Sequence, residues 1–158
     1  MDIEIKQIDP VGEDVEELFR LLDLHNLSHC PPEVCHLTQP QELLEIESAL
    51  FGVYCDGSLC GMGGLKFYDS YAEVTRMFVK ESFRGRGLAT ALLYELENYA
   101  IEMNKGELKL ETSEKFESAM SLYLNCGFVK CAPFGEYINK PYNTYMEKAL
   151  KNTNMKSE

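Results

Sequence analysis

The stretch FVKESFRGRGLATALLYELENYA, residues 78–100, determines how the rest of the sequence is interpreted. Apolar residues recur at helical spacing in its second half, and the residues RGRG before them predict a turn that opens a helix. The first N–H groups of a helix lack internal partners and carry partial positive charge. Gly85 and Gly87 have no Cβ, so the backbone there can fold closely around a ligand. The stretch therefore predicts a site for an anion, most plausibly phosphate.

The size and composition are those of one soluble globular domain. The chain has 158 residues, of which 45% are hydrophobic and 26% are charged. We expect a single domain over residues 1–150, followed by a frayed polar tail over residues 151–158. The net charge of −11 argues against general nucleic-acid binding, which needs basic surface to displace counterions.

Neither the apolar runs nor the cysteines indicate export. No apolar run approaches the roughly 20 residues that cross a bilayer. The first residues, MDIEIKQIDP, lack the apolar segment of a signal peptide. The six cysteines form no C-x-x-C pair and are expected to be reduced. We therefore expect a cytoplasmic protein without a membrane partner.

The segment HNLSHCPPEVCH, residues 25–36, contains residue types that bind metals. Its spacing matches no zinc pattern, and two consecutive prolines constrain the backbone in its middle. We expect no metal site.

Hydrophobic periodicity and turn signals predict a mixed order of strands and helices. Antiparallel strands combined with crossover helices indicate an α+β sheet. Strands are expected over 2–8, 51–55, 58–68, 71–79, 107–112, 127–131 and 143–150, and helices over 13–29, 41–50, 86–103 and 116–125.

Three known phosphate motifs can be compared with the turn. The P-loop pattern G-x-x-x-x-G-K-[ST] is absent from the sequence. The dinucleotide pattern G-x-G-x-x-G is met only in its first half, and the turn follows an antiparallel run. The pattern [RQ]-x-x-G-x-[GA] is met at every fixed position by RGRGLA, residues 84–89. The third motif therefore fits best.

A second motif supplies the context. AMSLYLNCGF, residues 119–128, resembles the A-x-x-L-Y-x-x-x-G-F signature of the GNAT acyl-CoA-dependent N-acetyltransferases. The resemblance covers about residues 2–150, and SHCPPEVCHL, LETS and PFGEY resemble a branch that acetylates small amines or amino acids. It implies a central, mostly antiparallel mixed sheet of six to seven strands. This sheet is splayed between strands 4 and 5 and flanked by about four helices.

The resemblance also implies a reaction, a cosubstrate and its binding residues. Acetyl is transferred from acetyl-CoA to a primary amine of a small molecule. The splayed strand around Phe78 would bind the pantetheine arm through backbone groups of Met77 and Val79, and the Met77 N–H would stabilise the oxyanion. The turn would hold the pyrophosphate with Arg84, Gly85, Arg86, Gly87, Leu88, Ala89 and Thr90.

The resemblance makes Tyr123 the candidate general acid, in contact with the cofactor sulfur. A phenol beside the sulfur can protonate the leaving thiolate. Helical periodicity alone favours a half-buried structural tyrosine instead. Many relatives carry Asn three residues before the alanine of this motif, where the present chain has Phe116.

Glu73 is the first choice for the base that deprotonates the acceptor amine. Counting in twos places Glu73, Thr75, Met77 and Val79 on one face of the strand. The same count turns Arg76 to the opposite face, so no substrate carboxylate is assigned to it. A solvent-facing carboxylate without a catalytic role is the alternative interpretation of Glu73.

The acceptor pocket is expected between residues 29–36 and the loop around Tyr137, with His29 and Tyr137 as substrate-binding candidates. A homodimer is compatible with the resemblance. Two alternatives stay open: acetylation of protein lysines or N-termini, and a non-catalytic module that senses acyl-CoA. A sensor needs the phosphate turn but not Tyr123.

Overall fold

The computed structural model describes residues 2–28, 42–43, 47–140 and 143–151. Two short 3-10 turns, Glu81–Phe83 and Gly135–Tyr137, accompany its helices and strands. In chain order these are β1 (Ile3–Ile8), α1 (Glu13–Leu27), β2 (Ser48–Cys55), β3 (Ser58–Phe67), β4 (Tyr71–Val79), α3 (Leu88–Glu102), β5 (Glu107–Thr112), α4 (Glu117–Asn125), β6 (Val129–Cys131) and β7 (Thr144–Ala149).

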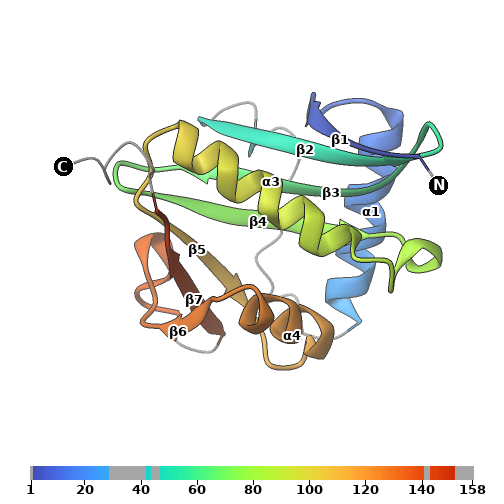
Figure 1. The fold of residues 1–158 in the computed structure, drawn as a ribbon. Coiled ribbons are helices and arrows are strands. Elements are labelled where there is room, and N and C mark those ends of the chain that lie inside the picture. The colour runs from blue at the N-terminus through green and yellow to red at the C-terminus, as the bar shows by residue number, and fades with distance from the viewer. Residues whose placement is uncertain (1, 29–41, 44–46, 141–142, 152–158) are drawn as a thin grey trace.

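The strands form one sheet of seven in the order β1-β2-β3-β4-β5-β7-β6 (Figure 1). Every neighbouring pair is antiparallel except β4 and β5, which are parallel. A parallel pair needs a crossover connection, and α3 supplies it. The predicted mixed, mostly antiparallel sheet is therefore confirmed, with three α-helices in the described part of the chain.

Helices pack on both faces of this sheet. In β2, Ala49 and Phe51 belong to the apolar cluster under α3, whereas Leu50 belongs to the cluster under α1. Consecutive strand residues point to opposite faces, so α3 and α1 cover opposite sides. Figure 1 shows α3 crossing one side of the sheet and α1 lying on the other.

One predicted element is wrong in part. Residues 48–50 were expected to end a helix over 41–50, but they begin β2. Ser48 pairs with Lys66 and Leu50 with both Gly64 and Ile8, so two neighbouring strands satisfy the backbone there. Residues 41 and 44–46 lie outside the described residues.

The sheet opens between its two parallel strands. Pairing between β4 and β5 runs from Tyr71–Glu107 to Val74–Leu110 and stops there, although β4 continues to Val79. Beyond Val74 the two strands diverge. The second half of β4 therefore borders an opening in the sheet, at the place where the family resemblance predicted a splay.

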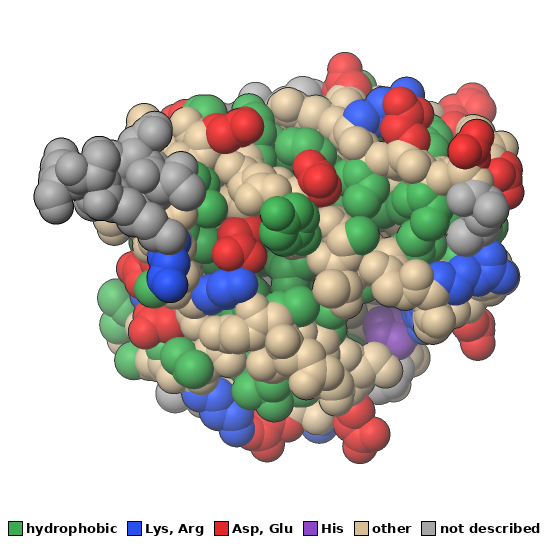
Figure 2. All heavy atoms as spheres, viewed as in Figure 1, with side chains coloured by type: hydrophobic (Ala, Val, Ile, Leu, Met, Phe, Trp, Pro, Cys, Tyr) green, Lys and Arg blue, Asp and Glu red, His purple; other side chains and the backbone are tan. Residues whose placement is uncertain are grey.

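The surface is mixed in charge. Figure 2 shows acidic and basic side chains interspersed among apolar and neutral atoms on this face, without a large basic patch. Among the helices of the described ranges, none has the length and apolar character needed to span a membrane.

Candidate active site

A β-bulge lies in the middle of β4. Gly64 of β3 pairs with Thr75 of β4. The next pair, two residues back along β3, joins Met62 to Phe78, which is three residues further along β4. The extra residue coincides with a left-handed backbone at Arg76, whose φ is 57°. A non-glycine residue there is strained, and such strain concentrates at functional sites.

The bulge resets the alternation of side chains along β4. Met77 and Val79 pack with the apolar cluster under α3. Glu73 pairs with Lys109, whose neighbours along β5 belong to that cluster, so Glu73 faces the other side. The prediction that Glu73 and Thr75 share a face with Met77 and Val79 is therefore wrong.

Arg76 also differs from its prediction. It was expected to face away from Glu73, but it lines the same cavity as Glu73. Its guanidinium forms a salt bridge with Asp23 and lies 4.9 Å from the ring centroid of Phe19, both on α1. The extra residue of the bulge turns this side chain toward α1.

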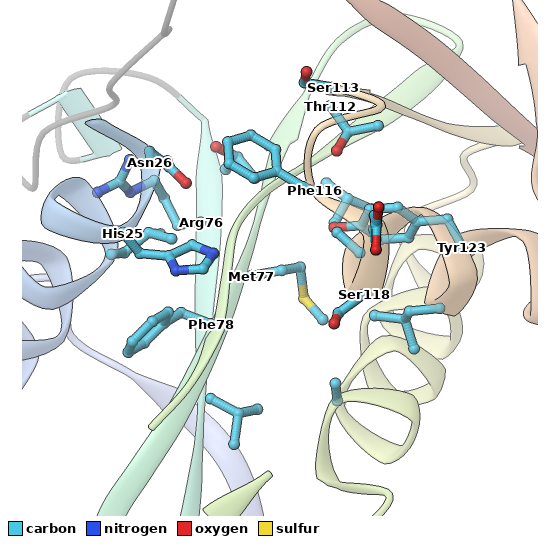
Figure 3. A pocket seen from close by; sticks show the side chains of 18 of the residues that line it. His25, Asn26, Arg76, Met77, Phe78, Thr112, Ser113, Phe116, Ser118 and Tyr123 are labelled. Carbon is cyan, nitrogen blue, oxygen red and sulfur yellow. The ribbon is translucent and has the colours of Figure 1, made fainter. Parts of the chain in front are cut away.

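A cavity of about 820 Å³ lies at the opening between β4 and β5. One wall is residues 73–79 of β4, and the turn before α3 closes one end. The first turns of α4 form the opposite wall. Tyr137 and Asn143 also line the cavity. Figure 3 shows Met77 between His25 on the α1 side and Tyr123 on the α4 side.

The turn before α3 has the geometry of an anion cradle. Gly85 and Gly87 have φ values of 78° and 77°, and Gly87 is the N-cap of α3 without a side-chain cap bond. A Cβ built on either glycine meets no heavy atom within 4 Å, so the space above the backbone is open. The first N–H groups of the helix can therefore bind an anion directly.

The arginines of the turn have different positions. Arg84 Nε donates a 2.8 Å hydrogen bond to the Val79 carbonyl, and its guanidinium lies 5.3 Å from the Phe78 ring centroid. The Arg84 side chain therefore connects the turn to the end of β4. Arg86 is exposed, lies over the Phe83 ring and is not among the residues that line the cavity.

Apart from Arg86, all the residues expected to bind the cofactor line the cavity. They are Met77, Phe78, Val79, Arg84, Gly85, Gly87, Leu88, Ala89, Thr90 and Tyr123.

Glu73 is buried, with 4% of its surface exposed. Burial raises the pKa of its carboxyl to about 7, partly opposed by a hydrogen bond from the Tyr137 hydroxyl and by the charge of Lys66. The Tyr137 hydroxyl lies 2.7 Å from Glu73 Oε2. Glu136 and Glu111 raise the Glu73 pKa further. This carboxylate can accept a proton near neutral pH.

Tyr123 projects from α4 into the cavity and is 7% exposed. Its ring packs edge-on against Phe128 at 5.6 Å between centroids. Burial, and to a lesser degree the nearby Cys126, raises the pKa of its phenol well above the usual value. The group therefore stays protonated at physiological pH and can donate a proton or a hydrogen bond.

Two residues of the α1 wall, His25 and Asn26, were not assigned to the acetyl-transfer site from the sequence. The His25 ring stacks on Phe116 at 5.9 Å between centroids with an interplanar angle of 27°. These two rings meet from opposite walls of the cavity (Figure 3). No local pattern distinguishes His25 from the predicted His29, which lies outside the described residues.

No group of three or more His, Cys, Asp or Glu side chains suited to a metal ion occurs within the ranges that the structure describes.

Comparisons with known proteins agree with this geometry. A family model described as "Acetyltransferase (GNAT) family" matches residues 14–128. The "IAA acetyltransferase" of Azospirillum brasilense is 30% identical over 151 residues, covering 94% of this chain and 99% of that protein. The "Uncharacterized N-acetyltransferase YedL" of Escherichia coli K12 is 29% identical over 131 residues, covering 81% of this chain and 82% of that protein.

Solved structures show the same fold. The PaiA N-acetyltransferase from Thermoplasma acidophilum, in complex with coenzyme A, has a TM-score of 0.73 and 21% identity over 94% of this chain and 99% of its own. An acetyltransferase of the GNAT family from Staphylococcus aureus Mu50 has a TM-score of 0.72 and 20% identity, over 95% and 100% of the two chains.

Proposed function

Because this chain belongs to the acetyltransferase (GNAT) family and is therefore an acyl-CoA-dependent N-acetyltransferase, we propose that it acetylates a primary amine of a small molecule. The amine attacks the thioester directly while both substrates are bound. The main support is Glu73, a buried carboxylate with a pKa of about 7 in the cavity that Tyr123 also lines.

The glycine turn fits the pyrophosphate of coenzyme A. Its open backbone N–H groups, at the start of α3, would bind the phosphate oxygens, and Thr90 lies within the same first turn. Met77 lies between this turn and Glu73, and its N–H would donate to the oxygen on which negative charge develops. Acetyl-CoA supplies the acetyl group as a thioester.

Glu73 and Tyr123 would move the two protons of the reaction. An alkylammonium group with a pKa near 10.4 is almost entirely protonated at pH 7 and cannot attack. Glu73 would accept this proton, directly or through water. Tyr123 would donate its phenolic proton to the departing sulfur, and the second proton, which the nitrogen loses after attack, would restore the phenol through water.

Thermal unfolding with and without acetyl-CoA, beside thiol-release assays on a panel of amines, tests the proposal. We expect the melting temperature to rise with acetyl-CoA concentration and some amines to release thiol. A thermal shift without turnover of any amine would instead favour a protein acceptor or an acyl-CoA sensor. No shift at millimolar acetyl-CoA would contradict the assigned cofactor turn.

Gly87→Ala is expected to weaken acetyl-CoA binding about tenfold or more. The added methyl group occupies the open space over the turn and disfavours the left-handed φ of 77°. Gly57→Ala is the matched control, because Gly57 has a φ of 85° and equally open surroundings in the β2–β3 turn. Both variants should lose stability, but calorimetric titration should show weaker binding only for Gly87→Ala. Equal affinities would contradict the assignment.

Tyr137→Phe is expected to shift the acid limb of the pH–rate profile upward by about one pH unit. The Tyr137 hydroxyl stabilises ionised Glu73, so its removal raises the pKa of that carboxyl above about 7. Initial rates between pH 5 and 9 measure the shift. Tyr94→Phe, at an exposed tyrosine of α3, should leave the profile unchanged. An unmoved midpoint in Tyr137→Phe would show that the bond does not tune the reacting base.

A further inference from the structure

Hydrogen bonds within the described residues occupy only part of the buried Arg76 guanidinium. Its side chain is 2% exposed, and Nη2 bonds both to the Asp23 carboxylate and to the Phe19 carbonyl, the latter at 3.4 Å. Nε is also buried, and it has no hydrogen-bond partner among the residues that the structure describes. Joining α1 to β4 explains the bonds of Nη2. It does not explain why a second donor is buried without an acceptor.

This guanidinium lies at the end of the cavity nearest α1. Arg76 lines that cavity together with His25 and Asn26 of α1, and all three lie on the same side of Met77 in Figure 3. Arg76 directly precedes Met77 in the bulge. An acceptor whose amine reaches a thioester carbon held beside Met77 can therefore extend another group toward Arg76.

We propose that Arg76 binds a carboxylate of the acceptor, so that the acceptor is an amine that also carries a carboxylate, as amino acids do. The inference rests on the proposed function and names the substrate class of the same site.

Guanidinium chemistry favours a carboxylate over other acceptors. A hydrogen bond from a guanidinium N–H to a carboxylate oxygen is charge-assisted and stronger than a bond to a neutral acceptor. Asp23 and the Phe19 carbonyl accept the hydrogen bonds of Nη2, which leaves the buried Nε–H for a carboxylate oxygen of the acceptor. Glu73 and Glu111 line the same cavity and suit the ammonium group of the acceptor. Arg76 and these two glutamates thus fit the two charges of an ammonium carboxylate.

The first test compares each of the common amino acids, together with ω-amino acids of increasing length, with its carboxamide. The amide keeps the amine and the side chain but loses the negative charge. With wild-type enzyme we expect kcat/KM for the best acid to exceed that of its amide about 30-fold or more, mainly through KM. This ratio needs no variant, so it does not depend on how well an altered protein folds.

Variants then assign the ratio to Arg76. Arg76→Gln should reduce the ratio to about 1, and Arg76→Lys should keep only part of it, because an ammonium keeps the charge but not the planar arrangement of donors. Arg20→Gln removes an exposed arginine from α1, the helix that carries Asp23, and should leave the ratio unchanged. Asp23→Asn removes the competing anion and should keep or increase the ratio. A merely structural ion pair would make Asp23→Asn and Arg76→Gln behave alike.

Turnover of amides as fast as acids would overturn the inference and leave the proposed function intact. The inference would also fail if the acid-to-amide ratio of kcat/KM survived in Arg76→Gln, or if Asp23→Asn lost it equally. If acetyl-CoA raises the melting temperature but neither acids nor amides release thiol, both the inference and the proposed small-molecule function fail.

Discussion

Tyr123→Phe is expected to lower kcat by about 100-fold or more while acetyl-CoA still binds. Loss of a positioned general acid costs on the order of 10²–10⁴ in rate. The ring and its edge-on contact with Phe128 remain, so packing should change little. Steady-state thiol release gives kcat, and calorimetric titration with CoA gives the affinity.

Two results would separate this role from a structural one. Tyr94→Phe removes an exposed hydroxyl from α3, outside the cavity lining, and should keep full activity. The Tyr123→Phe profile should lie below that of wild type by the same factor between pH 6 and 9, since burial keeps the Tyr123 pKa above this range. Wild-type kcat in Tyr123→Phe at every pH would remove Tyr123 from the mechanism.

Glu73→Gln is expected to lower kcat/KM at pH 8 by about 100-fold and to abolish the acid limb of the pH–rate profile. In wild type the rate should rise with pH and level off above about 7, because burial raises the pKa of Glu73 to that value and only the ionised carboxylate accepts a proton. Glutamine cannot accept it. Initial rates from pH 5 to 9 measure both effects, with the exposed Glu102→Gln as control.

The same substitution has an opposite effect on stability. Since the folded protein disfavours the ionised form of Glu73, the free energy of unfolding falls as pH rises from about 4.5 to about 7. Glu73→Gln lacks this cost. It should melt at a higher temperature than wild type at pH 8, with a smaller difference near pH 5. If Glu73→Gln leaves the pH–rate profile unchanged, another group is the base.

Sequence patterns were sufficient for most of the order of elements along the chain and for both motifs. The turn at Gly85 and Gly87 and the helix carrying Tyr123 are read from consecutive residues, because capping, glycine conformations and helical periodicity are local properties. The departure at Phe116 was also visible in the sequence. Its stacking on His25 was not, because these residues are 91 positions apart and meet only across the cavity.

The face of the sheet on which each β4 side chain lies required the tertiary structure. Counting in twos assumes an uninterrupted strand, but the register between β3 and β4 contains one extra residue. Nothing in YAEVTRMFV marks Arg76 as that residue. The count therefore placed Glu73 and Met77 on one face and turned Arg76 away from the cavity that it lines.

The sequence by itself determined the family resemblance, most of the order of elements, the glycine turn before α3 and the candidate roles of Glu73 and Tyr123. Only the tertiary structure decided the orientation of Arg76, the bond from Tyr137 to Glu73 and the burial that raises the Glu73 pKa to about 7. The physical reason is the range of the interactions. Helix starts and turns depend on neighbouring residues, whereas register, burial and electrostatic environment depend on residues that folding brings together from distant parts of the chain.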